Sequence, residues 1–143
     1  MIQIPADALA QIRRHAREAY PEECCGALLG EPSGENARVQ RVEALVNRSA
    51  EERGRRYVVS PEDYVRVERG AEKEGLSLLG FYHSHPDHPP VPSEFDREHA
   101  LPFFHYIVMA VPRGEPGEAL SWTLSADRGV FEGEELVSDA LRR

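Results

Sequence analysis

The chain has 143 residues, of which 41% are apolar and 29% are charged, and this balance predicts one globular domain spanning residues 1–143. It excludes a collagen, a disordered tail and a membrane span, because no run reaches the roughly 18 consecutive apolar residues that a transmembrane helix needs. The net charge of -8 repels phosphate groups and argues against binding to nucleic acid or an anionic membrane.

Hydrophobic spacing and turn residues predict two main helices, one short helix and several short strands. The clearest helix start is Ser60-Pro61-Glu62-Asp63, which combines an N-cap residue, a first-turn proline and early acids. The predicted helices cover 5–20, 61–75 and 93–100. The predicted strands cover 24–29, 39–46, 56–60, 76–82, 106–111, 120–125 and 129–131. Strands mixed with two main helices predict an α/β sandwich around one mixed sheet.

The strand over 76–82 leads directly into His83-Ser84-His85. His83 and His85 are two residues apart on an extended segment, where alternate side chains share a face, so both imidazoles point the same way. The next segment, 86–92, contains four prolines and is predicted to be a stiff loop. Two nitrogen donors on one face indicate a metal site.

Asp96 is the candidate third ligand, because the stiff loop can return the chain towards the two imidazoles. A catalytic zinc site takes three protein ligands and leaves the fourth position for water. Asp96 also lies in the first turn of a helix, where the helix dipole favours the carboxylate form that a metal requires. Ser93 is the predicted N-cap, and its oxygen accepts the N–H of Asp96 while its own proton stays free to donate to an oxyanion.

Each piece has a simpler interpretation when it is taken alone. A His-x-His pair is more often packing or surface than ligand, and Ser-x-x-Asp is a capping box on many helices without chemistry. The combined spacing is more specific. If each of the four residue types occurs at about 5%, chance gives the pattern in about one chain in a thousand of this length.

The spacing of His83-Ser84-His85-Pro86, Ser93 and Asp96 resembles the motif of the JAMM (MPN+) metalloproteases. The segment Glu23-Cys24-Cys25-Gly26 is similar to the Glu-x-x-Gly stretch on an early strand of that family, and the match selects Glu23 over Glu22. The resemblance covers nearly the whole chain and is most specific at 23–30 and 80–96. It implies a cytidine-deaminase-like α/β/α fold, and the short chain is similar to the compact prokaryotic members.

The resemblance also implies a mechanism and a substrate class. One zinc ion per chain is expected on His83, His85 and Asp96, with Glu23 as general base and then acid, and with Ser93 as donor to the oxyanion. The implied substrate is the amide bond after the C-terminal Gly-Gly of a ubiquitin-like or sulfur-carrier protein. Ser84 and His88 are the candidate substrate-binding residues, His88 from the rim of the site. The sequence leaves open the leaving group and whether the chain forms a homodimer.

Two other functions compete with this interpretation. His83-Ser84-His85-Pro86-Asp87-His88 also matches the His-x-His-x-Asp-His string of metallo-β-lactamase-fold hydrolases, in which Asp87 and His88 would be ligands. Those enzymes have longer chains, and Pro89-Pro90 stands where they would need a helix to start. The second alternative is a non-catalytic zinc-binding MPN scaffold, although no ligand of the motif is missing here.

The expected location is the cytosol, because the start of the chain has neither a basic nor an apolar leader segment. Cys24 and Cys25 are adjacent and cannot form a disulfide framework, so we expect two buried thiols in an apolar strand. The basic stretch Arg53-Gly54-Arg55-Arg56 is usual for a solvated loop, and contact with an acidic ubiquitin-like partner is the alternative hypothesis.

Overall fold

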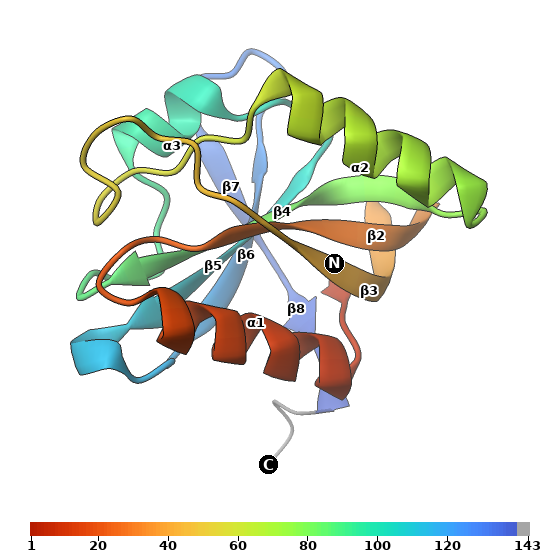
Figure 1. Cartoon of the computed structure of the whole chain (residues 1–143). Helices are drawn as coiled ribbons and strands as arrows, with labels where there is room; N and C mark the ends of the chain where they lie inside the picture. Colours follow the sequence, from red (N-terminus) through yellow and green to blue (C-terminus); the bar gives the residue numbers. More distant parts are fainter. Residues whose placement is uncertain (140–143) are drawn as a thin grey trace.

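The computed structural model describes residues 1–139, which form an eight-stranded sheet with helices on both faces (Figure 1). The helices are α1 (Ala6–Ala19), α2 (Pro61–Lys73) and α3 (Glu94–His99), and a 3-10 turn, η1, spans Pro112–Gly114. The strands are β1 (Ile2–Gln3), β2 (Cys25–Ser33), β3 (Asn36–Leu45), β4 (Ser77–Pro86), β5 (His105–Val111), β6 (Ala119–Leu124), β7 (Phe131–Glu134) and β8 (Leu136–Val137). Their order across the sheet is β7-β6-β5-β4-β2-β3-β1-β8.

The sheet is mixed and lies between two helical layers. β2 pairs antiparallel with β3 and β4, whereas β4 pairs in parallel with β5. Leu9 and Ile12 of α1 share one apolar cluster with Tyr82, while Val67 of α2 shares the other with Phe81. Because neighbouring residues of a strand point to opposite faces, β4 contributes to both cores. Figure 1 shows α1 on one side of the sheet and α2 with α3 on the other, which confirms the predicted α/β/α sandwich.

The start of α2 agrees with its sequence signature. The Ser60 side chain accepts a hydrogen bond from the backbone N–H of Asp63 at 3.1 Å, and Pro61 occupies the first turn. The cap satisfies one of the four N–H groups that a helix start leaves without a partner in the helix.

The predicted strand over 56–60 is wrong. This segment joins no strand of the sheet, and its backbone is instead held by the side chain of Asn47. The Asn47 amide donates to the carbonyl of Arg56 at 2.9 Å, and its oxygen accepts the N–H of Val58 at 3.1 Å. These side-chain bonds, together with one backbone bond from the Arg48 N–H to the Val58 carbonyl at 2.8 Å, take the place of a strand ladder, and the β-branched composition alone could not show this.

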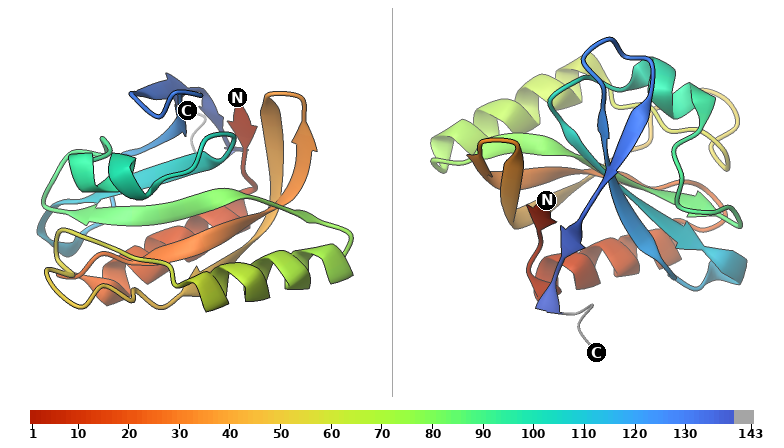
Figure 2. Two further views of the ribbon diagram at one scale, coloured as in Figure 1. Left: turned by 90° about the horizontal axis from the view of Figure 1, so that it is seen from above. Right: turned by 180° about the vertical axis from the view of Figure 1, so that it is seen from behind.

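The ends of the sheet also differ from the prediction. β1 and β8 were not predicted, since two residues each are too short for an alternating pattern, yet they pair with each other in parallel (Figure 2). The last predicted strand, 129–131, is displaced to β7. Ser125, Asp127 and Gly129 form a hydrogen-bonded turn before it, which delays the strand.

β4 is longer than predicted and continues through the two histidines to Pro86. Its middle contains Gly80 with φ of +155°, and a Cβ atom there would overlap the backbone carbonyl of His105 on β5. Only glycine allows the two strands to approach this closely. With β5 on one side and β2 on the other, β4 is a central strand of the sheet.

Glu134 joins three segments at the far end of the sheet. Its Oε2 accepts hydrogen bonds from His105 Nδ1 at 2.7 Å and from the Ser121 hydroxyl at 2.8 Å, and its Oε1 lies 3.2 Å from the N-terminal ammonium group. Burial alone would raise the pKa of Glu134, but the hydrogen bonds from His105 and Ser121 lower it below its ordinary value of 4.5.

We expect Glu134→Gln to lower the free energy of unfolding by about 1 to 2 kcal/mol at neutral pH. A lowered folded-state pKa stabilises the fold above the unfolded pKa of 4.5, and this contribution is lost as the pH falls through the folded-state pKa. Urea unfolding at about pH 7 and about pH 3 measures the difference between wild type and variant. A difference that does not shrink at the lower pH would contradict the assignment.

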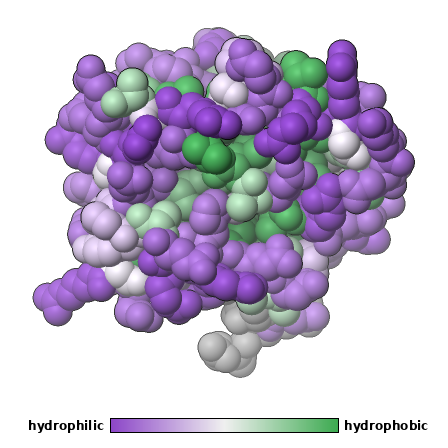
Figure 3. All heavy atoms as spheres, in the orientation of Figure 1, coloured by the Kyte–Doolittle hydropathy of each residue, from purple (hydrophilic) through white to green (hydrophobic). Residues whose placement is uncertain are grey.

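No helix within residues 1–139 is long and apolar enough to cross a membrane. The face seen in Figure 3 is largely hydrophilic, with apolar residues visible where the surface is hollowed near its middle.

Candidate functional site

Three donor atoms converge at the end of β4. His83 Nε2, His85 Nε2 and Asp96 Oδ2 lie 3.1 Å from one another in every pair. The histidines share a face because they alternate on β4, and Asp96 enters from the first turn of α3. All three side chains are buried. The structure thus brings together the three residues that the sequence nominated as ligands.

The arrangement fits a tetrahedral metal ion. Zinc bonds of about 2.0 Å place neighbouring donor atoms about 3.3 Å apart, close to the separation seen here. His83 Nδ1, Asp96 Oδ1 and Glu23 Oε1 are buried and have no hydrogen-bond partner among the described residues. Buried polar atoms without partners are costly. The converging donor atoms are the other nitrogen of His83 and the other oxygen of Asp96, and two imidazoles with a carboxylate form a donor set that zinc accepts.

The surroundings favour the neutral ring of His83 and the carboxylate of Asp96, the forms that a metal requires. Burial opposes protonation of His85, but contacts with Asp96, Glu23 and the Pro89 carbonyl outweigh it and raise the pKa of His85. His85 Nδ1 lies 2.9 Å from the carbonyl of Pro89, so Nδ1 carries the proton and Nε2 keeps its lone pair. Burial lowers the pKa of His83, whose ring stacks on Tyr57 with centroids 4.3 Å apart. Burial alone would raise the pKa of Asp96, but the neighbouring histidines and a backbone N–H lower it well below its ordinary value.

Ser93 and Asp96 form the predicted cap of α3. The Ser93 hydroxyl oxygen accepts the Asp96 N–H at 3.1 Å, and the Ser93 N–H donates to Asp96 Oδ2 at 2.8 Å. The capping box therefore fixes the same carboxylate oxygen that faces both imidazoles. Since the hydroxyl accepts this bond, its proton remains free to donate.

Glu23 lies across from the three donor atoms, immediately before β2. A carboxylate oxygen of Glu23 and the donor atoms of His83, His85 and Asp96 all lie within 4.8 Å of one another. The Glu23 backbone N–H donates to the carbonyl of Arg53 at 2.7 Å, which fixes where the side chain emerges. Glu23 is only 4% exposed, and burial raises its pKa to about 8, with His85 opposing the rise and Asp96 adding to it.

Gly26 explains the spacing of the Glu-x-x-Gly stretch. Gly26 on β2 pairs with Tyr82 on β4, and the Tyr82 ring lies over Gly26. A Cβ atom at Gly26 would overlap this ring. Glycine therefore permits the close approach that sets Glu23 beside the end of β4. Glu22, which the motif did not select, is exposed.

A pocket of about 540 Å³ opens onto this cluster. Glu23, His85, Ser93 and His88 are among the residues that line it. Arg56, from the basic stretch noted in the sequence, lies on another wall, where its guanidinium is 4.6 Å from the centre of the ring of Phe95, a residue that the sequence did not identify. The remaining lining residues are Arg55, Pro89, Val91 and Glu94.

Ser84 is a correction to the predicted substrate-binding residues. Its side chain is fully buried, and its hydroxyl accepts the N–H of Cys24 at 2.8 Å. Alternation along β4 turns Ser84 away from the face that carries the two histidines. Ser84 is thus placed to join β4 to the start of β2 and does not line the pocket.

The metallo-β-lactamase alternative is wrong, because Asp87 points away from the histidines. Asp87 Oδ2 accepts the hydroxyl of Tyr20 at 2.7 Å, and its Oδ1 accepts the N–H of Arg113 at 2.7 Å. These bonds tie the loop after β4 to the end of α1 and to η1. The carboxylate that faces His83 and His85 belongs to Asp96.

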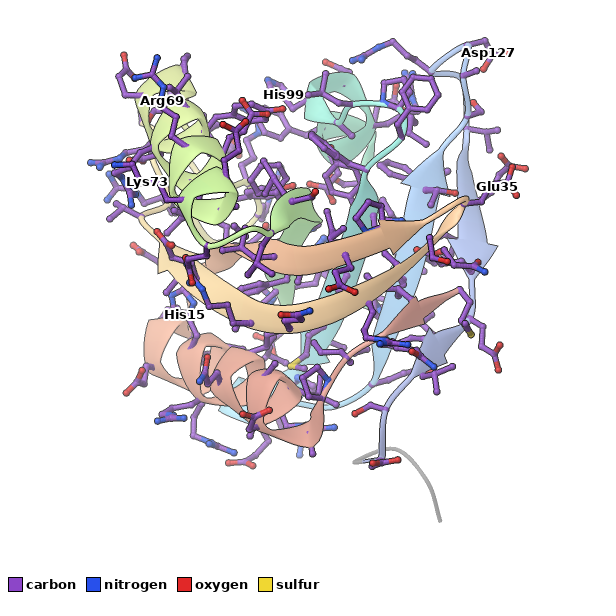
Figure 4. All side chains as sticks on the ribbon, turned by 90° about the vertical axis from the view of Figure 1, so that its right-hand side faces the viewer. His15, Glu35, Arg69, Lys73, His99 and Asp127 are labelled. Atoms are coloured by element: carbon purple, nitrogen blue, oxygen red, sulfur yellow. The ribbon has the colours of Figure 1, made fainter. Side chains whose placement is uncertain are left out.

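His15, His99 and the two cysteines lie outside the cluster of candidate metal ligands. His15 lies on α1 and His99 on α3 (Figure 4), where their ring nitrogens contact Tyr82 and the Phe95 carbonyl respectively. Cys24 and Cys25 are free, buried thiols, as predicted. Burial raises their pKa values, to about 11 for Cys24 and about 12 for Cys25, so neither is a ready thiolate.

The chain is similar to several known proteins, both in sequence and in structure. The chain is 37% identical over 127 residues to a "Desampylase" of Haloferax volcanii, which covers 85% of this chain and 88% of that protein. It is 31% identical over 108 residues to a "Probable TtuB-protein conjugate cleaving protease" of Thermus thermophilus, covering 76% of this chain and 69% of the relative. The solution structure of protein DSY2949 from Desulfitobacterium hafniense matches with a TM-score of 0.84 and 28% identity, over 97% and 93% of the two chains.

The sandwich fold and the Glu, His, His and Asp cluster define a hydrolase of the JAMM type. Residues 5–125 match the family described as prokaryotic homologs of the JAB domain, and the chain belongs to this family. The predicted family and enzyme class are therefore confirmed.

Proposed function

We propose that the protein is a zinc-dependent isopeptidase that hydrolyses the amide bond between the C-terminal Gly-Gly of a ubiquitin-like or sulfur-carrier protein and an attached group. The observation that carries the proposal is the convergence of Glu23, His83, His85 and Asp96 within 4.8 Å. The names of the two relatives, a desampylase and a probable conjugate-cleaving protease, support this substrate class.

His83, His85 and Asp96 would hold the zinc ion. When bound, zinc lowers the pKa of a water ligand to about 7 and polarises the scissile carbonyl. Three protein donors are the number that catalytic zinc sites use, so His83, His85 and Asp96 would leave the ion able to bind a water. The Pro89 carbonyl orients the His85 ring, and the Ser93 N–H orients the Asp96 carboxylate, before the metal enters.

Glu23 is the group that moves protons. Its carboxylate would take a proton from the attacking water and return it to the leaving amine, and Glu23 lines the pocket in which both groups would lie. Burial raises the pKa of Glu23 to about 8, and a zinc ion beside it would oppose this rise, because a nearby positive charge favours the carboxylate form that accepts a proton. Ser93 donates its free proton to the oxyanion that forms on the attacked carbonyl.

The substrate tail would lie extended in the pocket of about 540 Å³, with His88 at its rim. Two glycines without side chains suit the approach of a backbone to a buried metal. Arg55 and Arg56 lie on the wall of this pocket, where they can meet acidic groups of a partner.

The direct test uses β-grasp carrier proteins from the same organism, each carrying a C-terminal cysteine, a lysine isopeptide or a linear extension. We expect cleavage after Gly-Gly of at least one class, loss of cleavage with a chelator, and recovery on adding zinc. Mass spectrometry of the products locates the cut. Cleavage that persists in the chelator, or a cut at another bond, would contradict the proposal.

A further inference from the structure

The loop between β4 and α3 is held by its carbonyl groups. Pro89, Pro90 and Pro92 have no N–H to donate, so this part of the chain offers mostly acceptors. The Pro89 carbonyl accepts the Nδ1–H of His85 at 2.9 Å, and the next carbonyl, that of Pro90, accepts the indole N–H of Trp122 at 3.1 Å. Two adjacent carbonyl groups thus join the loop to a candidate ligand on one side and to the sheet on the other.

Trp122 is well placed to fix this loop. It lies on β6 between Tyr106 on β5 and Gly133 on β7, two strands away from β4 in the sheet. Its ring packs over Gly133, where a Cβ atom would lie 3.6 Å from the indole. The opposite end of the loop is held separately, because Asp87 binds Tyr20 and the backbone of Arg113.

We infer that Trp122 is a positioning residue for the zinc site: its indole N–H holds the Pro90 carbonyl so that the adjacent Pro89 carbonyl orients the imidazole of His85. The inference rests on the proposed metal site. Besides His85 itself, Trp122 supplies the side-chain hydrogen bond that joins this part of the loop to the sheet among residues 1–139, and the Val91 N–H, which also donates to the Pro89 carbonyl, belongs to the loop itself. Without the indole bond, the His85 ring samples orientations in which Nε2 does not face His83 and Asp96. His85 would then lose its direct partner, the Pro89 carbonyl, and loss of such a direct partner of a ligand lowers metal affinity about 10- to 100-fold.

The chain offers a clean way to delete this hydrogen bond, because Trp122 is its single tryptophan. Growth of a tryptophan auxotroph on benzothienylalanine replaces that one side chain by a group of nearly the same shape in which sulfur stands where the N–H was. Trp122→Phe is the genetically encoded companion. Tyr106→Phe is the matched control, since Tyr106 faces Trp122 across β5 and β6 and its hydroxyl binds the Leu101 N–H, away from the loop.

Zinc affinity is measured for each purified protein by competition with a chromophoric chelator, and folding of the metal-free proteins is checked by circular dichroism. We expect the dissociation constant to rise about tenfold or more in both tryptophan replacements and to stay unchanged in Tyr106→Phe. Equal affinity in wild type and the benzothienylalanine protein would overturn the inference, as would an equal loss in Tyr106→Phe. Failure of the wild type itself to bind zinc would instead overturn the proposed function.

Discussion

Glu23→Gln is expected to lower kcat about 100- to 10,000-fold on a cleavable carrier conjugate while the protein still binds zinc. Glutamine has nearly the same shape as glutamate and preserves the packing at this buried position, but it cannot take a proton from water. His83, His85 and Asp96 are unchanged, so the metal site stays complete. Steady-state kinetics together with metal analysis of the same preparation separate the two effects.

The matched control is Glu22→Gln, which removes the neighbouring exposed carboxylate. Surface substitutions of this kind have small effects, so its kcat should equal that of the wild type. If both variants lost activity equally, a change in the structure of the segment before β2 would explain the loss, and the proton-transfer role of Glu23 would be contradicted. Full activity in Glu23→Gln would show that another group moves the protons.

Asp96→Asn is expected to weaken zinc binding by more than about 100-fold, beyond the usual cost of losing an outer contact. The amide oxygen can still accept the Ser93 N–H and preserve the cap of α3, but it lacks the negative charge that faces both imidazoles. Competition with a chelator measures the change. Activity should fall in parallel with zinc occupancy.

Asp87→Asn serves as the comparison, because it makes the same chemical change nine residues earlier on the loop after β4. Its Oδ1 can still accept the Arg113 N–H, and the zinc affinity should be unchanged. The reverse result, with Asp87→Asn losing zinc and Asp96→Asn keeping it, would restore the metallo-β-lactamase interpretation that the geometry contradicts.

Local rules are enough to predict that His83, His85 and Asp96 lie close together. Strand alternation places His83 and His85 on one face, and helix capping fixes Asp96 against Ser93, so short-range spacing is enough. Glu23 needed the family motif, since an acid before a strand has no distinctive pattern by itself. Its position depends on the close packing of Gly26 against Tyr82, a contact between strands.

The outer parts of the site could not be predicted, since long-range contacts place them. Arg56 reaches Phe95 because the side chain of Asn47 holds its backbone out of the sheet. Trp122 on β6 reaches Pro90 across 32 residues of sequence, from a strand that lies two positions from β4 in the sheet. Ser84 was misplaced for a simpler reason, because alternation along β4 already turned it away from the two histidines.

X-ray absorption at the zinc edge of the purified wild-type protein tests the central claim most directly. It should show one zinc ion per chain, bound by two imidazole nitrogens and by oxygen at about 2.0 Å, with no sulfur. Zinc with sulfur neighbours, which Cys24 and Cys25 would supply, or a protein that takes up no zinc at all, would contradict the site described here.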